Sequence, residues 1–208
     1  MMSRGGVEKT EEVARLFIDV YPGYEFLFSG VTHPKRIAKS SVAIPEAIVR
    51  IVAGQMLSRH AAKTIYQRCV ERAVASRLLG TWQLTREELR SCGLSGRKAD
   101  AIESFSKQYR SIPKLFERWW ELDPSELNRE VCNQKGMSDW TASMLSIFYL
   151  GHEDVFPSRD ASIKKAMVLA HQKSNSAKVI DPDAAKPFRS YLALYLWQAL
   201  DSGELRQH

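Results

Sequence analysis

Apolar residues recur every three or four positions along most of the chain, which is the spacing of one face of an α-helix. The sequence PEAIVRIVAGQML, which begins at Pro45, is the clearest case, because it forms an apolar stripe of Ile48, Ile51, Val52 and Met56. Further helices are predicted over residues 11–20, 59–74, 86–92, 97–109, 114–122, 125–134, 139–150, 163–170 and 188–200. No stretch alternates with a period of two, so the pattern predicts an all-α protein with roughly ten helices.

Capping residues mark where several of these helices begin and end. Ser58 is expected to cap the helix that follows the short joint 55–58. Thr85, with Glu88 three residues later, has the pattern of a capping box. Gly93 then ends that helix.

Three segments lack a clear helical pattern: residues 1–10, which we expect to be frayed, 21–43 and 171–186. We therefore predict an N-terminal helix and irregular arm over 1–44 that pack on a core. The core is expected to comprise 45–208, with its N-terminal part and the C-terminus forming a second lobe.

The chain is large enough for one good-sized domain or two small lobes that share a core. It has 208 residues, of which 44% are hydrophobic. There are 30 Lys and Arg residues against 24 Asp and Glu, which gives a net charge of +6. Such an excess suits a polyanionic partner, but it is also common in proteins that bind none.

The cysteines Cys69, Cys92 and Cys132 are far apart and form no CxxC pair. A four-cysteine zinc site or iron–sulfur cluster is therefore excluded from this chain alone, and buried reduced thiols are expected. No apolar run approaches the roughly 20 residues of a membrane span, and the first residues include acids where a signal peptide needs an apolar stretch. We expect a soluble intracellular protein, cytoplasmic or nucleoid-associated in a prokaryote and nuclear in a eukaryote.

The stretch 133–162 combines two features that point to chemistry on a nucleic acid. A tight turn at 135–138, KGMS, joins two helices, so backbone N–H groups point outward where the second helix begins. Such an arrangement binds an anion, usually phosphate. A lone acid, Asp160, follows at a fixed distance, after a short extended segment with Phe156 and Pro157.

Five segments occur in the order seen in the helix-hairpin-helix DNA glycosylase superfamily: AIVRIVAGQMLSRHAAKTI, LRSCGLSGRKADAI, NQKGMSDWTASML, DVFPSRDASI and KPFRSYLALYLW. The chain resembles most the 3-methyladenine DNA glycosylase II branch. The resemblance covers roughly residues 45–200, and the hairpin followed by FP-x-x-D is its most specific part.

The resemblance implies a two-lobed α-helical fold with the active site in the cleft between the lobes. It also implies that the protein flips a damaged nucleotide out of duplex DNA and then hydrolyses the N-glycosidic bond of its base. Asp160 matches the superfamily's catalytic acid, which stabilises positive charge on the deoxyribose. Asp is also a good helix N-cap, and the two roles are compatible.

Further roles follow from the resemblance. Met56, in preference to Leu57, matches the apolar wedge that fills the hole left by the flipped base, although its spacing also suits a core residue. The base pocket is expected to include Gln55, Trp140 and Met144, although an indole at the start of a buried helix can equally be core.

The residues expected at the DNA phosphates are Lys135, Gly136, Met137, Ser138, Thr141 and Arg159. A monovalent cation can bind at 135–138 in this superfamily, and no catalytic metal, redox cofactor or cluster is expected. Other basic residues are further candidates, most of them more typical of solvated helix faces: Arg59, Lys63, Arg97, Lys98, Lys164, Lys165 and Arg189.

Three departures from the superfamily pattern bear on activity. Ser138 replaces a second hairpin glycine, which can weaken the phosphate contact or add a hydroxyl to it. Trp140 occupies the position where members that also cut the backbone carry a nucleophilic lysine, which predicts a monofunctional enzyme. Ala185 lies where members with broad alkyl-base activity have a tryptophan that can stack on a cationic purine.

The sequence thus predicts a monomeric, monofunctional glycosylase of base excision repair that acts on an alkylated base in double-stranded DNA. Two alternatives remain open. One is a glycosylase for another base, such as uracil, mismatched thymine or oxidised guanine. The other is a non-catalytic DNA-damage-binding protein on the same scaffold, which the changes at Ser138 and Ala185 motivate and the retained Asp160 argues against.

Overall fold

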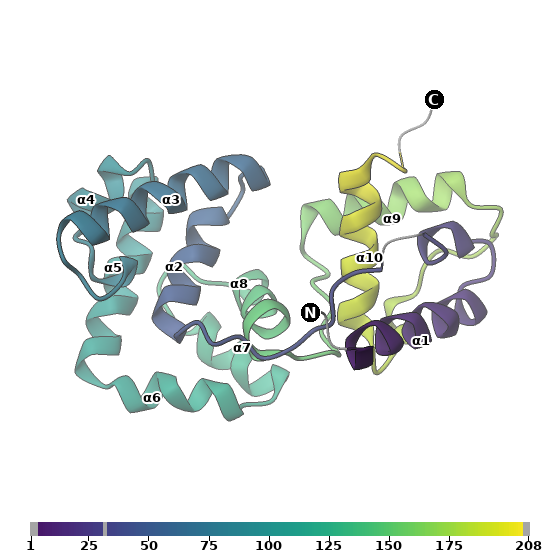
Figure 1. Cartoon of the computed structure of the whole chain (residues 1–208), viewed down its shortest axis with the longest axis horizontal. Coiled ribbons are helices and arrows are strands. Elements are labelled where there is room, and N and C mark those ends of the chain that lie inside the picture. The colour runs from purple at the N-terminus through teal and green to yellow at the C-terminus, as the bar shows by residue number, and fades with distance from the viewer. Residues whose placement is uncertain (1–3, 31–32, 206–208) are drawn as a thin grey trace. The chain divides into compact units, whose positions relative to one another are not determined.

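The structure, a computed structural model, describes residues 4–30 and 33–205. These residues form helices joined by turns and include no strand, which confirms the predicted all-α class. The chain divides into two compact units (Figure 1). Unit 1 comprises Met1–Ala38 and Gly151–His208, and unit 2 comprises Lys39–Leu150. The arm, which was expected to pack on the core, groups with the C-terminal segment in unit 1, which the chain enters again after Leu150.

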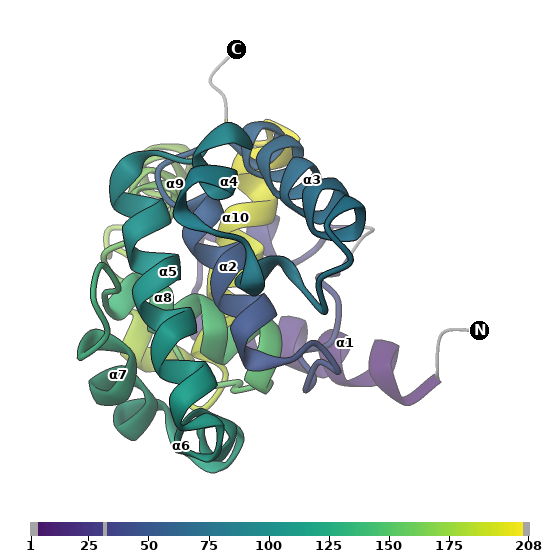
Figure 2. The ribbon, with the colours of Figure 1, turned by 90° about the vertical axis from the view of Figure 1, so that its left-hand side faces the viewer.

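Unit 2 contains seven of the described α-helices. They are α2 (Ile44–Gly54), α3 (Arg59–Ala75), α4 (Arg86–Ser91), α5 (Gly96–Ser111), α6 (Pro113–Glu117), α7 (Pro124–Cys132) and α8 (Asp139–Leu145). The last continues into a π-helical turn over Ser146–Leu150, and short 3-10 turns occupy Thr81–Gln83 and Arg118–Glu121. Helix α2 contacts α3, α5 and α8 (Figure 2), so the most hydrophobic helix lies in the interior of this unit.

The predicted caps in unit 2 are present. The hydroxyl of Ser58 accepts a hydrogen bond from the backbone N–H of Ala61 at 3.3 Å. Thr85 and Glu88 form the reciprocal bonds of a capping box, at 3.3 Å and 2.9 Å. The helix boundaries at these points are therefore set by local sequence.

An aromatic cluster in unit 2 joins α5 to α6 and to the 3-10 turn that follows α6. The Trp119 side chain is completely buried, and its ring centroid lies 5.2 Å from that of Phe116 and 5.9 Å from that of Phe105. Clustered aromatic rings combine a large buried apolar area with favourable edge-to-face contacts. This cluster supports α5, which in turn supports the α7–α8 hairpin described below.

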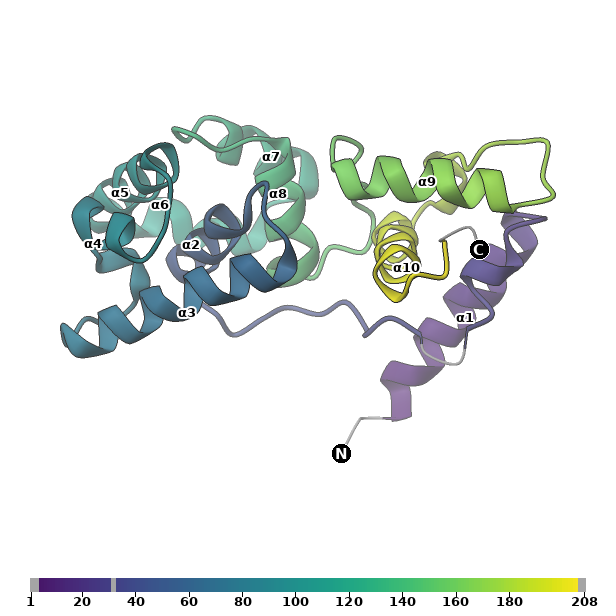
Figure 3. The same cartoon turned by 90° about the horizontal axis from the view of Figure 1, so that it is seen from above.

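Unit 1 contains α1 (Arg4–Val20), α9 (Ala161–Lys173) and α10 (Arg189–Ser202), with 3-10 turns at Glu25–Leu27 and Pro182–Ala185. Helix α9 crosses and contacts α10 (Figure 3). Two helices are longer than the pattern predicted, because α1 includes residues expected to be frayed and α9 runs to Lys173.

The core of unit 1 joins the arm to the C-terminal helix. The Phe28 ring centroid lies 5.3 Å from those of Phe17 in α1 and Tyr195 in α10. Leu16 has the helical spacing of an inward residue but is 39% exposed, because the buried stripe of α1 passes through Val13, Ala14 and Phe17. No helix among the described residues has the length and hydropathy needed to cross a membrane.

Candidate active site and DNA-binding hairpin

The turn between α7 and α8 is held closed by backbone hydrogen bonds. Gln134 N–H donates to the carbonyl of Val131 at 2.9 Å, and Met137 N–H donates to the carbonyl of Gln134 at 3.2 Å. Gly136 has a φ of +75°, and a Cβ there would lie only 2.7 Å from the Cβ of Ala101 in α5. Glycine is therefore required twice, by the left-handed backbone and by the close approach to α5.

Ser138 begins α8 in an extended conformation, with φ −146° and ψ 174°. Its N–H donates to the Thr141 hydroxyl at 3.4 Å. Because the backbone at Ser138 does not have a positive φ, no glycine is needed there. Serine therefore adopts this backbone conformation without strain.

The hairpin residues differ in exposure. Lys135, Gly136 and Ser138 are exposed, whereas Met137 is only 8% exposed and anchors the turn in the core. The N–H groups of Lys135 and Gly136 donate to no acceptor among the described residues. The exposed turn therefore offers backbone donors, as an anion site requires.

Thr141 differs from the phosphate contact that the sequence suggested. Its side chain is completely buried, and its hydroxyl accepts from Ser138 N–H and from the Gln55 side-chain amide, the latter at 3.2 Å. The side chain thus braces the hairpin from inside and links it to the end of α2. A completely buried side chain of this kind forms no contact at the protein surface.

The turn after α2 exposes the residue expected to be the wedge. Helix α2 ends at Gly54, and Met56 follows with a φ of +56° and a side chain that is 97% exposed. Met56 therefore does not belong to the buried stripe of α2, contrary to the helical spacing that grouped it with Val52. Leu57 is 40% exposed. Of the two apolar residues, Met56 projects further into solvent.

Trp140 and Met144 lie one helical turn apart in α8. Trp140 is half-buried, and Met144 is only 7% exposed. Gln55, the third residue assigned to the base pocket, is half-buried and uses its side-chain amide on Thr141. The structure thus gathers all three in unit 2, and their role at a base stays a prediction.

Asp160 lies in unit 1 at the N-terminus of α9. One carboxylate oxygen, Oδ1, accepts the backbone N–H of Ile163 at 2.9 Å and the indole N–H of Trp197 at 3.2 Å. The residue is half-buried, and its backbone N–H donates to the carbonyl of Pro157 at 2.9 Å. Backbone, cap and indole together fix the orientation of this carboxylate.

Trp197 is a residue that sequence reasoning did not select. It belongs to the segment KPFRSYLALYLW, which was quoted for the resemblance, but its distance of 37 positions from Asp160 gave no local signal of contact. The only sequence clue is weak: a tryptophan in an otherwise apolar helix usually needs a hydrogen-bond acceptor for its indole N–H.

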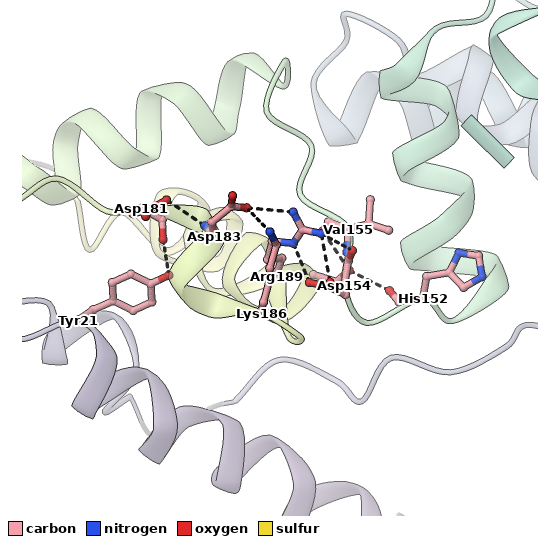
Figure 4. Close-up of polar contacts among 9 residues, drawn as sticks. Tyr21, His152, Asp154, Val155, Asp181, Asp183, Lys186 and Arg189 are labelled. Carbon is pink, nitrogen blue, oxygen red and sulfur yellow. Dashed lines mark hydrogen bonds and ion pairs between the residues drawn. The ribbon is translucent and has the colours of Figure 1, made fainter. Parts of the chain in front are cut away.

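The segment that leads to Asp160 is tied to the start of α10 (Figure 4). Ser190 Oγ accepts from Val155 N–H at 2.9 Å and donates to the carbonyl of His152 at 2.8 Å. The Arg189 guanidinium forms two hydrogen bonds with the Asp154 carboxylate, at 2.7 Å and 3.1 Å, and another with Asp183 at 3.1 Å. This bidentate pairing raises the pKa of Arg189. Arg189 is therefore engaged within the protein and is not a free phosphate contact.

Of the other basic candidates, Lys98 differs most from expectation. Its ammonium group is turned inward, where it donates to the backbone carbonyls of Gln55 at 2.6 Å and Ala53 at 3.0 Å. The others have exposed side chains: Arg59, Lys63, Arg97, Arg159, Lys164 and Lys165. Nearly all of the chain's excess of basic over acidic residues belongs to unit 2. Among the described residues, no group of three or more His, Cys, Asp or Glu side chains could hold a metal ion.

Solved structures with the same fold are DNA glycosylases. The 3-methyladenine DNA glycosylase of Schizosaccharomyces pombe, solved in complex with abasic DNA, superposes with a TM-score of 0.74 at 24% identity, over 91% of this chain and 97% of that one. The DNA-3-methyladenine glycosidase of Bacillus halodurans superposes with a TM-score of 0.68 at 20% identity, over 93% and 91% of the two chains. The fold is thus that of the helix-hairpin-helix DNA glycosylases, as the resemblance implied.

Sequence similarity then identifies the family. No protein-family model matches the chain. However, DNA-3-methyladenine glycosylase 1 of S. pombe is 30% identical over 162 residues, which are 74% of this chain and 71% of that protein. The alkylbase DNA glycosidase-like protein mag2 of the same yeast is 28% identical over 165 residues, or 74% and 76% of the two chains. The chain belongs to the DNA-3-methyladenine glycosylase family.

Proposed function

We propose that the protein is a monofunctional DNA glycosylase that hydrolyses the N-glycosidic bond of an alkylated base in duplex DNA and leaves an abasic site. The observation that carries the proposal is the family membership, together with an acid at the start of α9 whose carboxylate is held in a fixed orientation. Release of such a base is one step of base excision repair.

Asp160 acts as the electrostatic catalyst in this proposal. As the bond between base and sugar breaks, positive charge develops on the deoxyribose. A carboxylate near C1′ stabilises that charge and orients the attacking water. The hydrogen bonds from Ile163 and Trp197 both reach Oδ1, so they hold the group in place through one oxygen.

The exposed turn 135–138 grips a phosphate of the damaged strand. The outward N–H groups of Lys135 and Gly136 supply hydrogen bonds, and the Lys135 ammonium adds attraction. Met56 enters the base stack and fills the space of the flipped nucleotide, for which its nearly complete exposure suits it. Trp140 and Met144 line the pocket that receives the base.

The monofunctional mechanism is supported by Trp140, because an indole cannot form a Schiff base with the opened sugar. The enzyme is therefore expected to leave intact strands that break only in hot alkali. Borohydride, which traps Schiff-base intermediates covalently, should give no adduct between the protein and a lesion-bearing duplex. A trapped adduct would contradict the mechanism.

A monovalent cation at 135–138 fits one feature of the hairpin. The side-chain oxygen of Gln134 is buried and accepts no hydrogen bond within the part of the chain described. A buried amide oxygen that accepts no hydrogen bond is a suitable ligand for a hard cation. Replacing potassium and sodium by choline at constant ionic strength should then weaken DNA binding, whereas equal affinity in both buffers would remove the cation from the proposal.

A glycosylase for a different base is the second candidate, and Ala185 favours it. This residue is completely buried in the turn Pro182–Ala185, so no aromatic side chain is presented from that position. A cationic methylated purine would lose one stacking partner there.

A panel of duplexes, each with one lesion, tests both candidates. It includes 7-methylguanine, 3-methyladenine, hypoxanthine, ethenoadenine, uracil and 8-oxoguanine, and base release is scored before and after hot alkali. Release of methylated purines with alkali-dependent breaks is the expected result. Release of only uracil or 8-oxoguanine would select the second candidate, and tight binding without any release would indicate a non-catalytic damage-binding protein.

A further inference from the structure

Met56 has a backbone conformation that its own side chain does not favour. Its φ of +56° is left-handed, and apart from Arg77 it is the only such residue other than glycine in the described ranges. A left-handed conformation at a residue with a Cβ is unfavourable and persists only where the surroundings impose it. Because the side chain is 97% exposed, its own packing cannot supply the compensation. Other groups must hold this turn.

Lys98 is the group that reaches the turn from outside α2. Its Nζ donates to the carbonyl oxygens of Ala53 and Gln55, at 3.0 Å and 2.6 Å, on either side of Gly54. The last carbonyls of a helix lack intrahelical partners and carry partial negative charge, so an ammonium group stabilises them. Lys98 is half-buried, and this burial lowers its pKa.

Gln55 is also held through its side chain. Its amide nitrogen donates to the Thr141 hydroxyl at 3.2 Å, and the same hydroxyl accepts the Ser138 N–H of the hairpin. The residue before Met56 is therefore fixed at its carbonyl by Lys98 and at its side chain by α8. The Thr141 hydroxyl thus connects the turn that carries Met56 to the hairpin 135–138.

We infer that Lys98 is a positioning residue for nucleotide flipping. Its ammonium group holds the turn so that Met56 remains left-handed and projects from the protein, ready to enter the base stack. The inference rests on the proposed function, and it assigns Lys98 a role distinct from a phosphate contact. Lys98 acts through Met56 and touches neither the base nor the sugar.

The first test compares a paired lesion with one that is already unpaired. The Lys98→Met variant keeps the length of the side chain but donates no hydrogen bond. Single-turnover release of 7-methylguanine opposite cytosine should slow by at least about tenfold, because the variant loses the charge-assisted hydrogen bonds to both Ala53 and Gln55. Release of the same base opposite a tetrahydrofuran abasic analogue should stay near the wild-type rate, because no base pair has to be broken before the nucleotide flips out. An equal loss on both duplexes would overturn the inference.

The second test asks whether Lys98 acts through Met56. The rate of a Lys98→Met, Met56→Ala double variant should equal that of Met56→Ala alone, since the positioned side chain is then absent. A Lys98→Met penalty that persists in the Met56→Ala background would overturn the inference. Lys107→Met is the matched control, because Lys107 lies on the same helix, is exposed and forms an ion pair with Glu103 at 3.1 Å. It should leave both rates unchanged.

Flipping is also measured without base release. The fluorescence of 2-aminopurine placed beside the lesion rises when its neighbour leaves the stack, and the rise should be smaller with Lys98→Met than with the wild type. If the wild type released no base from any duplex, the proposed function would fail, but this fluorescence comparison would still decide the role of Lys98. If Lys98→Met does not fold, as judged by Tm and circular dichroism, Lys98→Gln, whose side chain is shorter and uncharged, replaces it in the same comparisons. Equal slowing of base release on the paired and the unpaired duplex would again overturn the inference.

Discussion

The two helix N-termini to which we assign DNA binding and catalysis are built in opposite ways. At the start of α8, Ser138 and the preceding turn present backbone N–H donors to solvent. At the start of α9, the Asp160 carboxylate accepts a helix N–H and thus occupies that position itself. One helix end can therefore attract an anion, whereas the other holds one that is part of the protein.

The two regions also differ in the structural feature on which each depends. The hairpin depends on backbone geometry, which Gly136 permits and the buried Thr141 and Met137 support. The acid depends on one side chain, which Trp197 and the α9 backbone orient. Substitutions should accordingly separate DNA binding from catalysis, and each prediction below tests that separation.

The largest effect is expected for Asp160→Asn. Asparagine caps a helix as well as aspartate does, so Tm should change little. The negative charge is lost, and single-turnover base release should fall by about 100-fold or more, the scale found when a preorganised electrostatic group is removed. Duplex affinity, measured by fluorescence anisotropy, should remain near the wild-type value. Full activity in this variant would reduce Asp160 to a helix cap.

Gly136→Ala, in the hairpin, should have the opposite profile and reduce stability and DNA binding. The left-handed backbone and the 2.7 Å approach to Ala101 both oppose a Cβ, so we expect destabilisation of about 1–3 kcal/mol and weaker DNA binding. Thermal unfolding and salt-dependent binding measure the two consequences. Gly30→Ala is the control, because no atom of another described residue lies within 4 Å of the added Cβ. Unchanged affinity for Gly136→Ala would remove the hairpin from the DNA interface.

Trp197→Phe should affect catalysis and leave binding intact. The phenyl ring keeps most of the packing but removes the N–H that lies 3.2 Å from Asp160 Oδ1. Loss of one hydrogen bond to a charged group corresponds to a rate decrease of about tenfold. The same change at Trp120 in unit 2 serves as the control. A decrease in DNA affinity with normal single-turnover rates would show that Trp197 has a different role.

The smallest effect is expected for Ser138→Gly, which restores the glycine common in the superfamily. Ser138 has extended dihedral angles that serine adopts without strain, so the glycine offers no relief. The change should cost only a few tenths of a kcal/mol in stability and give no gain in affinity. A clear increase in affinity would mean that serine weakens the phosphate contact after all.

Local sequence was sufficient for much of the fold. The helical periodicity of α2 and the capping box at Thr85 depend on residues a few positions apart, and both were predicted correctly. The same holds for the glycine in the hairpin and the cap at Asp160, which are features of single turns. The family resemblance added the assignment of a DNA glycosylase fold.

Periodicity misled at Met56 and at Leu16, because both have helical spacing yet are exposed. In the first case α2 ends two residues earlier than the apolar pattern suggests, and in the second the buried stripe passes along a neighbouring line of α1. An apolar pattern records where side chains can be buried, but the partners that bury them come from elsewhere in the chain.

The sequence by itself determined the helices, their caps and the order of the motifs, since these rest on interactions within one or two turns. Only the tertiary structure decided that Lys98 turns inward to carbonyls 43 and 45 positions earlier, that Trp197 reaches Asp160 and that Thr141 is buried. These contacts join distant segments, so no local pattern encodes them. A hydrogen-bond donor on a helix surface looks the same in sequence whether it meets water or the end of another helix.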